Sequence, residues 1–395
     1  MSTNPVYLVV AFDHPLNVVE SVAERIAFGL SCQGLHAVAC CLPRDAEKMA
    51  RMSPDMISGI MSLGSPPLSC RVGNKRLWEC TNGPVTMYFL DAIIYDMARV
   101  PAMSEYIVAA QADHRLGFAS PERGYAQWLG PSLGVRWDYM PFGHFSQLNT
   151  PVEQAETQNK LCVVGTVGSE LGFSPAHESL ADLFARFNVG VAQRRDELTD
   201  RLFAADAKQI PALTLCEHFG WNAKEALSNL SLIIAVDSWI KRNKRIEAMK
   251  SLAGHAVDFF GFGWKELLGD IDGFRYFGQV KHQDIAKLMP HYRGLLNFDP
   301  NWEAGVHDRV YTACALGAVS LTNTNEALPE AQLPSDLVVT YNANKPNLGE
   351  LVEAHGILDP KPRMNVPRAD VLTAHSWSAR AAHWITLSQG TRLFN

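Results

Sequence analysis

The segment 294–325 restricts the fold more than any other part of the sequence. It contains an apolar strand, a polar loop with Gly305, a helix, a single glycine at Gly317 and a second apolar strand. Both strands are apolar on both faces, as strands of a buried parallel sheet are. Parallel strands that are joined through a helix form a right-handed crossover in nearly all sheets. The segment therefore predicts a doubly wound α/β sheet with helices on its faces.

The same rhythm extends over most of the chain and divides it into two series. Strand 6–12, helix 15–33 and strand 36–42 open the first series, and the strand at 161–164 opens the second. A length of 395 residues also exceeds one ordinary hydrophobic core. The polar segment 146–160 has no periodicity, and we predict that it is the linker between two domains.

These patterns predict the domain organisation. An N-terminal Rossmann-like domain covers 1–150 and a C-terminal one covers 151–375. The continuous helical pattern at about 175–245 interrupts the second series and predicts a helical insertion. The last residues, 376–395, are expected to form a helix that packs back toward the first domain. The segment 51–82 is rich in Met, Ser, Pro and Gly and predicts no definite element.

Composition and charge limit the functional classes. The formal net charge is -6 at pH 7, whereas binding to the nucleic-acid backbone needs a basic surface, so we expect no nucleic-acid partner. The first residues do not resemble a secretory leader, and no apolar run reaches the roughly 18 residues that span a bilayer. The eight cysteines include no C-x-x-C pair and are expected to be reduced. We therefore expect a cytoplasmic protein with no transmembrane segment, and a homo-oligomer stays open.

The loop and helix at 305–316 are suited to bind an anion. A helix that starts near His307 has free backbone N–H groups and a positive dipole end. Gly305 permits close approach of the backbone, and His307 and Arg309 can add hydrogen bonds and charge. Ligands of open α/β sheets bind at the carboxyl ends of the strands, where this loop is expected to lie. The alternative is that His307, Asp308 and Arg309 only cap a surface helix.

This stretch resembles the C-terminal donor-site motif of bacterial GT-B glycosyltransferases, particularly the spore-maturation-protein-like group. The matching residues are Leu296, Asn297, Pro300, Gly305, His307, Arg309, Val310, Tyr311, Ala313, Ala315 and Gly317. Further segments that resemble the group are 245–264, 276–280 and 375–380. The resemblance covers about 230–395, while 1–165 matches only in its α/β rhythm.

The resemblance implies a GT-B fold, in which two Rossmann-like domains face a cleft. It implies a metal-independent glycosyltransferase of the hexosyltransferase type, with a nucleotide-sugar donor in the C-terminal domain and a glycan or protein acceptor on the N-terminal side. No cofactor is expected besides the donor substrate. The expected donor-binding residues are Gly165, Gly168, Arg245, Gly263, Gly305, His307, Arg309 and Thr312. Thr312 departs from the group, which has a glutamate there to hold the donor ribose, because a threonine hydroxyl has a shorter reach.

Three polar residues that follow strands of the first domain are candidates for the catalytic base. Transfer with inversion needs a general base within hydrogen-bond reach of the acceptor hydroxyl. Asp13 and His14 follow strand 6–12, and Asp91 follows the strand that ends near Leu90. The alternative for Asp13 is that it caps the first helix.

Two other interpretations remain open at this point. A nucleotide-sugar epimerase can share the two-domain architecture, and a catalytically silent GT-B-like scaffold would explain the threonine at position 312. The sequence Asp270-Ile271-Asp272 spells the D-x-D that other glycosyltransferase folds use for a metal. It lies in an expected loop before a strand, and no catalytic metal is expected.

Overall fold

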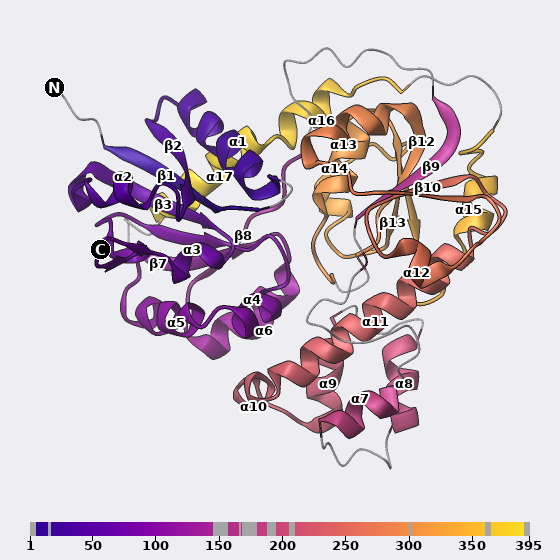
Figure 1. Cartoon of the computed structure of the whole chain (residues 1–395), viewed down its shortest axis with the longest axis horizontal. Coiled ribbons are helices and arrows are strands. Elements are labelled where there is room, and N and C mark those ends of the chain that lie inside the picture. Colours follow the sequence, from indigo (N-terminus) through magenta and orange to yellow (C-terminus); the bar gives the residue numbers. More distant parts are fainter. Residues whose placement is uncertain are drawn as a thin grey trace. The chain divides into compact units, whose positions relative to one another are not determined.

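The computed structural model describes residues 5–14, 17–144, 157–165, 167, 180–187, 195–204, 210–299, 302–359 and 365–390. The chain divides into two compact units (Figure 1). Unit 1 comprises Met1–His144 together with Thr373–Asn395, and unit 2 comprises Phe145–Leu372. The end of the chain therefore returns to the unit in which the chain begins.

Unit 1 is built on a six-stranded parallel sheet with the strand order β2-β1-β3-β6-β7-β8. The strands are β1 (Val6–Phe12), β2 (Ala37–Leu42), β3 (Ile57–Leu63), β6 (Val85–Tyr88), β7 (Leu116–Ser120) and β8 (Trp137–Tyr139). The helices are α1 (Val18–Cys32), α2 (Ala46–Ala50), α3 (Pro66–Ser69), α4 (Ile93–Arg99), α5 (Ala102–Ala112) and α6 (Arg123–Leu133), and a small hairpin pairs β4 (Arg71–Val72) with β5 (Lys75–Arg76). Six of the seven residues of β1 are buried, as its uninterrupted apolar sequence predicts.

The strand β3 is the main element that the sequence pattern did not reveal. It lies within the segment 51–82 and pairs with both β1 and β6 near the middle of the sheet. Its sequence, Ile-Ser-Gly-Ile-Met-Ser-Leu, contains two serines and a glycine. Gly59 is required there, because a Cβ at this position would lie 3.1 Å from the Pro84 carbonyl oxygen. Small residues at this crowded position thus hide a central strand.

The last helix, α17 (Trp377–Gly390), belongs to unit 1 and packs against α1. The two helices approach closely at Gly29, where a Cβ would lie 2.5 Å from the Ser378 Cα. Trp384 is fully buried, and its indole N–H donates to the Thr86 hydroxyl in β6 at 3.0 Å. Its ring meets Tyr7 of β1 edge to face at 5.8 Å. The C-terminal segment therefore completes the core of unit 1.

Unit 2 contains a second six-stranded parallel sheet with the order β11-β10-β9-β12-β13-β14. The strands are β9 (Gln158–Val164), β10 (Val257–Phe260), β11 (Phe274–Phe277), β12 (Tyr292–Leu296), β13 (Val319–Asn323) and β14 (Val338–Tyr341). The helices that alternate with these strands or follow them are α12 (Trp264–Leu268), α13 (His282–Leu288), α14 (Asp308–Ala315), α15 (Leu348–Ala354) and α16 (Ala369–Ala374). The fold class predicted from the sequence, two doubly wound α/β sheets, is confirmed.

Among its described residues, the segment between β9 and β10 contains helices and turns but no strand, which agrees with the predicted helical insertion. It contains α7 (Leu180–Arg186), α8 (Arg195–Phe203), α9 (Pro211–Phe219), α10 (Ala223–Ser228) and the long α11 (Leu230–Lys250). Figure 1 shows α11 extending from α9 and α10 to α12 beside the sheet. Residues 146–156 of the predicted linker lie outside the described residues, and its end is corrected, since β9 already begins at Gln158. The first strand residues are exposed, which explains their polar side chains.

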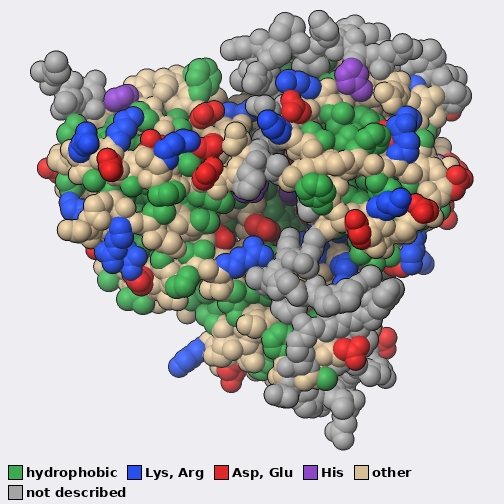
Figure 2. Space-filling model, in the orientation of Figure 1, with side chains coloured by type: hydrophobic (Ala, Val, Ile, Leu, Met, Phe, Trp, Pro, Cys, Tyr) green, Lys and Arg blue, Asp and Glu red, His purple; other side chains and the backbone are tan. Residues whose placement is uncertain are grey.

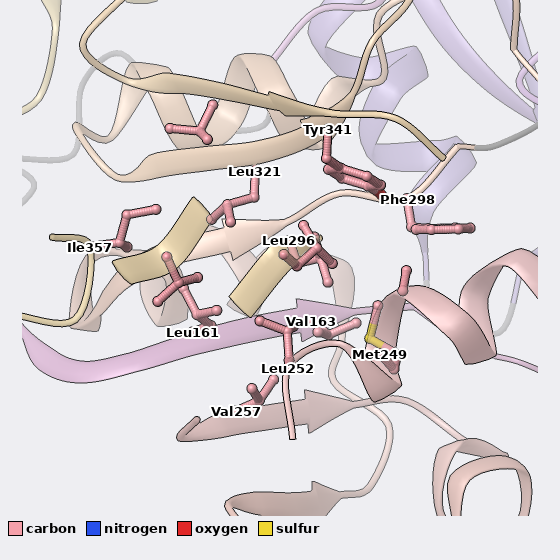
Figure 3. Packing of buried hydrophobic residues seen from close by; sticks show 14 of the residues in the cluster. Leu161, Val163, Met249, Leu252, Val257, Leu296, Phe298, Leu321, Tyr341 and Ile357 are labelled. Atoms are coloured by element: carbon pink, nitrogen blue, oxygen red, sulfur yellow. The ribbon is translucent and has the colours of Figure 1, made fainter. Parts of the chain in front are cut away.

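The core of unit 2 joins the end of α11 to one face of the sheet (Figure 3). Leu161 and Val163 of β9 pack with Met249 of α11 and with Leu296 of β12. Phe298 stacks on Tyr341 with ring centroids 6.0 Å apart. Residues from both sides of the helical insertion and from the end of α11 therefore share one apolar cluster.

Two further observations concern the surface and the cysteines. Charged side chains of both signs are interspersed on the described part of the face in Figure 2. All eight cysteines are free, and six of them are buried. Among the described residues, no helix has both the length and the apolar character needed to cross a bilayer.

The packing of α17 predicts a measurable loss of stability in the variant Trp384→Ala. Removal of a fully buried tryptophan should lower the free energy of unfolding by about 3–5 kcal/mol. Trp384→Phe keeps a ring beside Tyr7 but loses the hydrogen bond to Thr86 and part of the buried ring volume, so it should cost about 1–3 kcal/mol, less than Trp384→Ala. Urea unfolding followed by tryptophan fluorescence and circular dichroism measures both. Equal stability of the parent and Trp384→Ala would show that α17 is not part of the core.

Candidate functional site

The loops that follow β9, β10, β12 and β13 gather at the carboxyl edge of the sheet in unit 2. The edge contains a cation from α14. A Cβ at Gly165, which follows β9, would lie 3.7 Å from a terminal nitrogen of Arg309. In the described part of the chain, the Arg309 guanidinium has no ion pair or hydrogen bond. This edge therefore presents a half-buried, unpaired positive charge beside a bare backbone segment.

Glycines let the loops after β9 and β10 lie against each other. Gly263 has φ +84°, and a Cβ there would lie 1.7 Å from the Val167 carbonyl oxygen. Gly165 has φ +147° and donates its N–H to the Phe260 carbonyl at 2.9 Å. The Trp264 indole N–H donates to the Gly165 carbonyl at 2.7 Å. These contacts fix the peptide of Gly165 and leave its Cα face open toward Arg309.

His307 caps the helix that carries Arg309. It is the N-cap residue of α14, and its Nδ1 accepts the Arg309 backbone N–H at 3.3 Å. The same nitrogen lies beside the Asp308 carboxylate, and Nε2 lies 4.0 Å from the Asp299 carboxylate. The Trp302 ring packs on the imidazole with centroids 5.5 Å apart. The imidazole is therefore enclosed by two carboxylates and a tryptophan, and Arg309 is the cation that stays available.

A network of amide side chains holds the loop between β12 and α14. The Asn323 side chain makes two hydrogen bonds to the Asp299 backbone, at 3.0 and 3.1 Å. Asn297 donates to the Asp299 carboxylate at 2.7 Å. The Asn325 amide donates to the Gly305 carbonyl at 2.9 Å. Gly305 is buried and tied to this network, so its part in the site is to shape the loop.

Arg245 of α11 acts on Tyr341, the last residue of β14. Burial raises the pKa of Tyr341 well above its usual value, the charge of Asp299 raises it further, and the charge of Arg245 lowers it. The Tyr341 hydroxyl donates to the Asn297 carbonyl at 3.1 Å. Arg245 therefore lies within electrostatic reach of the network, although it is only partly exposed.

Thr312 is placed differently from what a ribose contact requires. Its side chain is fully buried, and its hydroxyl donates to the Asp308 carbonyl at 2.8 Å, four residues earlier in α14. This local bond uses the hydroxyl proton inside the helix. Of the eight predicted donor-site residues, Gly165, Gly263, Gly305, His307 and Arg309 lie in the loops or at the start of α14, Arg245 lies nearby, and Gly168 lies outside the described residues.

The predicted catalytic residues of unit 1 follow two strands of one sheet edge. Asp13 and His14 follow β1, and Asp91 follows β6, with β3 between them. Burial lowers the pKa of His14, and the Asp13 charge opposes this shift. The Asp91 carboxylate accepts the Ala92 N–H at 2.8 Å. His14 is therefore neutral at pH 7 and able to accept a proton.

Asp96 of α4 is a titratable group at this edge that the sequence pattern did not reveal. Burial raises its pKa to about 6, with a smaller upward contribution from Asp91 and a downward one from Ser65. A carboxyl group with such a pKa can exchange a proton near neutral pH. The pKa of Asp96 differs from that of a surface aspartate because of the packing of α4. No local sequence pattern therefore identifies this residue.

The D-x-D segment occupies a surface loop. It lies between α12 and β11, where the Asp270 carboxylate is 89% exposed and pairs with Lys265 at 3.4 Å. Neither Asp270 nor Asp272 has a resolved contact with the edge that carries Arg309. This segment serves as an ordinary exposed turn.

Comparison with known proteins adds a family-model match over part of the chain and a fold. Residues 242–386 match a protein-family model described as glycosyl transferase-like. Among solved structures, sucrose-phosphate synthase from Thermosynechococcus elongatus resembles the chain with a TM-score of 0.51 and 12% identity, over 99% of this chain and 100% of that one. A glycosyltransferase from Rickettsia africae covers 98% of both chains with a TM-score of 0.49 and 9% identity. No curated protein matches the sequence.

These findings confirm the predicted fold and enzyme class. The chain has two parallel-sheet α/β units that match GT-B structures, and the glycosyl transferase-like region includes α14 and the loops around it. The family-model match supports a glycosyltransferase, and the structural likeness shows the fold. The narrower resemblance to the spore-maturation-protein-like group stays a prediction.

The environment of Thr312 predicts opposite results for two substitutions. Thr312→Val removes one hydroxyl, which donates to the Asp308 carbonyl within α14, so it should change the free energy of unfolding by about 1 kcal/mol or less. Thr312→Glu forces a larger, charged side chain into a filled space and should cost at least about 1–3 kcal/mol from overpacking alone. Urea unfolding of both variants measures these differences. A Thr312→Glu protein as stable as the parent would show that the position opens toward a ligand.

Proposed function

We propose that this protein is a nucleotide-sugar-dependent glycosyltransferase that binds the donor diphosphate at the carboxyl edge of unit 2. The observation that carries the proposal is the Arg309 guanidinium at the start of α14, which lies beside the Gly165 backbone and has no ion pair or hydrogen bond among the described residues. An arginine fork can donate two parallel hydrogen bonds to a phosphate group. The positive end of the α14 dipole adds to the attraction for an anion.

In this proposal, the carboxyl edge of unit 2 stabilises the nucleoside diphosphate as the leaving group. When the bond between the anomeric carbon and the diphosphate breaks, the bonding electrons stay on the diphosphate oxygen. Arg309 would bind that developing charge, which lowers the barrier because the interaction strengthens in the transition state. The enclosed His307 would contribute by holding Arg309 in place through the cap of α14. A divalent metal is not needed in this scheme.

The proposed acceptor side lies in unit 1, where a base takes the proton of the attacking hydroxyl. His14 is the first candidate, because its lowered pKa keeps the imidazole neutral at pH 7. Asp91 and Asp13 remain candidates, and Asp96 is added to them. We further propose a glycan or protein acceptor, a cytoplasmic location and kinship with the spore-maturation-protein-like group. The eight free cysteines agree with a reducing compartment.

The first experiment tests the activity itself. Purified protein is mixed with UDP-, GDP-, ADP- and dTDP-sugars, and the release of each nucleoside diphosphate is followed over hours. Slow release from one donor is expected, since water can replace a missing acceptor at a low rate. Conversion of one nucleotide sugar into an epimer, without release of diphosphate, would instead indicate the epimerase. Absence of both release and binding would favour the silent scaffold.

Substitution of Arg309 should weaken binding of the nucleoside diphosphate. Hydrogen bonds to a charged group contribute about 1.5–3 kcal/mol each, so Arg309→Ala should raise the dissociation constant about ten- to a hundredfold. Arg309→Lys keeps the positive charge but lacks the two parallel donors of the guanidinium. Its dissociation constant should therefore lie between those of the parent and of Arg309→Ala. Titration calorimetry with the diphosphate of the preferred donor measures the change.

The matched control is Arg368→Ala. The Arg368 guanidinium lies on the surface of the same unit and pairs with Asp370 at 3.1 Å and Asp336 at 3.6 Å. Its removal should leave the dissociation constant within about twofold of the parent. Unchanged affinity in Arg309→Ala would reject the proposed diphosphate site.

The pH dependence of transfer distinguishes His14 from Asp96. The rate should fall on acidification as the base is protonated, which for His14 occurs below its usual pKa of about 6.5 and for Asp96 near pH 6. His14→Gln should lower the rate at pH 7 about 10²- to 10⁴-fold and abolish this acid limb, while Asp96→Asn should leave it. Rates at saturating donor between pH 5 and 8 provide the measurement. Loss of the limb in Asp96→Asn alone would assign the base to Asp96.

A further inference from the structure

The strand β13 continues into a polar segment, 323–326, that bonds to the loop between β12 and α14. The two strands pair through their backbones as far as Leu296 and Leu321, which Figure 3 shows in the core. One more backbone bond follows, in which the Asn297 N–H donates to the Leu321 carbonyl at 2.8 Å. Beyond this point, two asparagine side chains of the segment 323–326 bond to the backbone of the loop.

These two side chains, Asn323 and Asn325, hold the two ends of the loop. Asn323 is 1% exposed, and its side chain accepts the Asp299 N–H at 3.0 Å and donates to the Asp299 carbonyl at 3.1 Å. The Asn325 amide donates to the Gly305 carbonyl at 2.9 Å. Gly305 lies two residues before His307, the N-cap of α14. The bond from Asn325 therefore reaches the backbone directly before the helix start.

The segment that carries the two asparagines is itself held from other directions. The Thr324 N–H donates to the Tyr341 carbonyl of β14 at 2.9 Å. The Asn325 side-chain oxygen accepts the N–H groups of Ala327 and Leu328 at 3.0 and 3.2 Å. Because this oxygen is bound to two backbone donors, the amide nitrogen is the atom that is directed at the loop. Asn325 thus connects a fixed strand end to the entry of α14.

We propose that Asn325 is a positioning residue for the donor site: it holds the Gly305 carbonyl and thereby places the start of α14, which carries Arg309. Asn323 fixes the other end of the same loop. The two asparagines act on the ligand only through the loop and the helix. The identity of the ligand rests on the proposed function, whereas the placement of the helix start rests on the hydrogen bonds above.

A purely structural role for Asn325 would give a different result. In that role the side chain only caps the turn at 327–328, through the two N–H groups that its oxygen accepts. Aspartate makes turns of this kind as well as asparagine does, and serine makes them more weakly. Loss of the cap would lower stability, and it would leave the loop before α14 and the affinity for a diphosphate unchanged. The test therefore has to remove the amide nitrogen and keep an acceptor oxygen.

Two variants of Asn325 meet this condition. In Asn325→Asp a carboxylate can still accept both N–H groups, but it cannot donate to the Gly305 carbonyl. Asn325→Ser is the neutral variant, since its hydroxyl can accept the N–H groups and is too short to reach the loop. The matched control is Asn222→Asp, at the exposed start of α10, where the side-chain oxygen accepts the Glu225 N–H at 3.0 Å. The control adds the same charge to unit 2 and keeps a cap of the same kind.

The first experiment needs no ligand. Amide hydrogen exchange of the full chain compares the parent with both Asn325 variants and with Asn222→Asp. The peptide that covers 302–310 should exchange faster in both Asn325 variants, while β12 stays protected, because local opening follows the lost bond. The backbone bond from the Glu326 N–H to the Glu303 carbonyl, at 3.0 Å, is kept in every variant, so the loop should loosen without detaching. Asn222→Asp should equal the parent.

The second experiment measures binding of UDP, or of whichever nucleoside diphosphate the parent binds most tightly, by titration calorimetry. Asn325→Ser should raise the dissociation constant about 3- to 30-fold, the range of effects transmitted through contacts. Asn325→Asp should raise it at least as much, because its charge also repels the diphosphate, and only this added part should shrink at high salt. Asn222→Asp should leave the dissociation constant unchanged.

A double variant tests whether Asn325 acts through Arg309. Once Arg309 is replaced by alanine, the placement of the helix start matters less for the diphosphate. Asn325→Ser should therefore weaken binding less in the Arg309→Ala background than in the parent. Fully additive effects would mean that Asn325 acts on the ligand by another route and would overturn the proposal.

The experiments separate two kinds of failure. Equal exchange of 302–310 in the parent and in both Asn325 variants overturns the positioning role, whatever the ligand. Faster exchange together with parent-like affinity overturns it as well, because the loop then does not place Arg309. A parent that binds no nucleoside diphosphate overturns the proposed function, while the exchange result still decides whether Asn325 holds the loop. If Asn325→Asp does not fold, Asn325→Ser removes the same bond without adding a charge.

Discussion

The structure of unit 2 depends on the pairing of β9 with both β10 and β12. These hydrogen-bonded partners join residues that are about a hundred positions apart in the sequence, since Val164 faces Phe260 and Val163 faces Leu296. The pairing brings the end of β9 to the start of the Gly261–Gly263 turn. It also sets Gly165 beside the helix that follows β12. The site is therefore a product of sheet register, and the apolar cluster of Figure 3 fixes that register from one face.

Much of this arrangement was predictable because the strands of a parallel sheet are apolar on both faces. The strands at β1, β9, β12 and β13 and the helical insertion followed directly from the pattern. β3 did not, because tight packing at Gly59 selected small residues and removed the pattern. Local sequence therefore predicts a strand well where large apolar side chains fill the core. It predicts a strand poorly where close packing of the backbone leaves room only for small residues.

The candidate site shows the same division. Gly165, Gly263 and Arg309 could be named from the sequence because glycine turns and a charged helix start have local patterns. Asp96 could not, since its raised pKa comes mainly from burial by other elements. Thr312 was identified as a departure from the motif, and its hydrogen bond to Asp308 explains how the helix accommodates the change. A match to a motif position therefore indicates a binding role only when the side chain at that position also points toward the ligand.

The distribution of charges around α14 explains why a single arginine can act as the anion site. Asp299 and Asp308 both lie within a few ångströms of His307, and unpaired carboxylates there would repel a diphosphate. The Asn297 amide donates to the Asp299 carboxylate, and the Asn323 side chain bonds to the Asp299 backbone. Because the Arg309 guanidinium takes no part in this network, its charge is not neutralised before the ligand arrives. An arginine paired with either carboxylate would first have to break that ion pair, and the affinity for a diphosphate would fall accordingly.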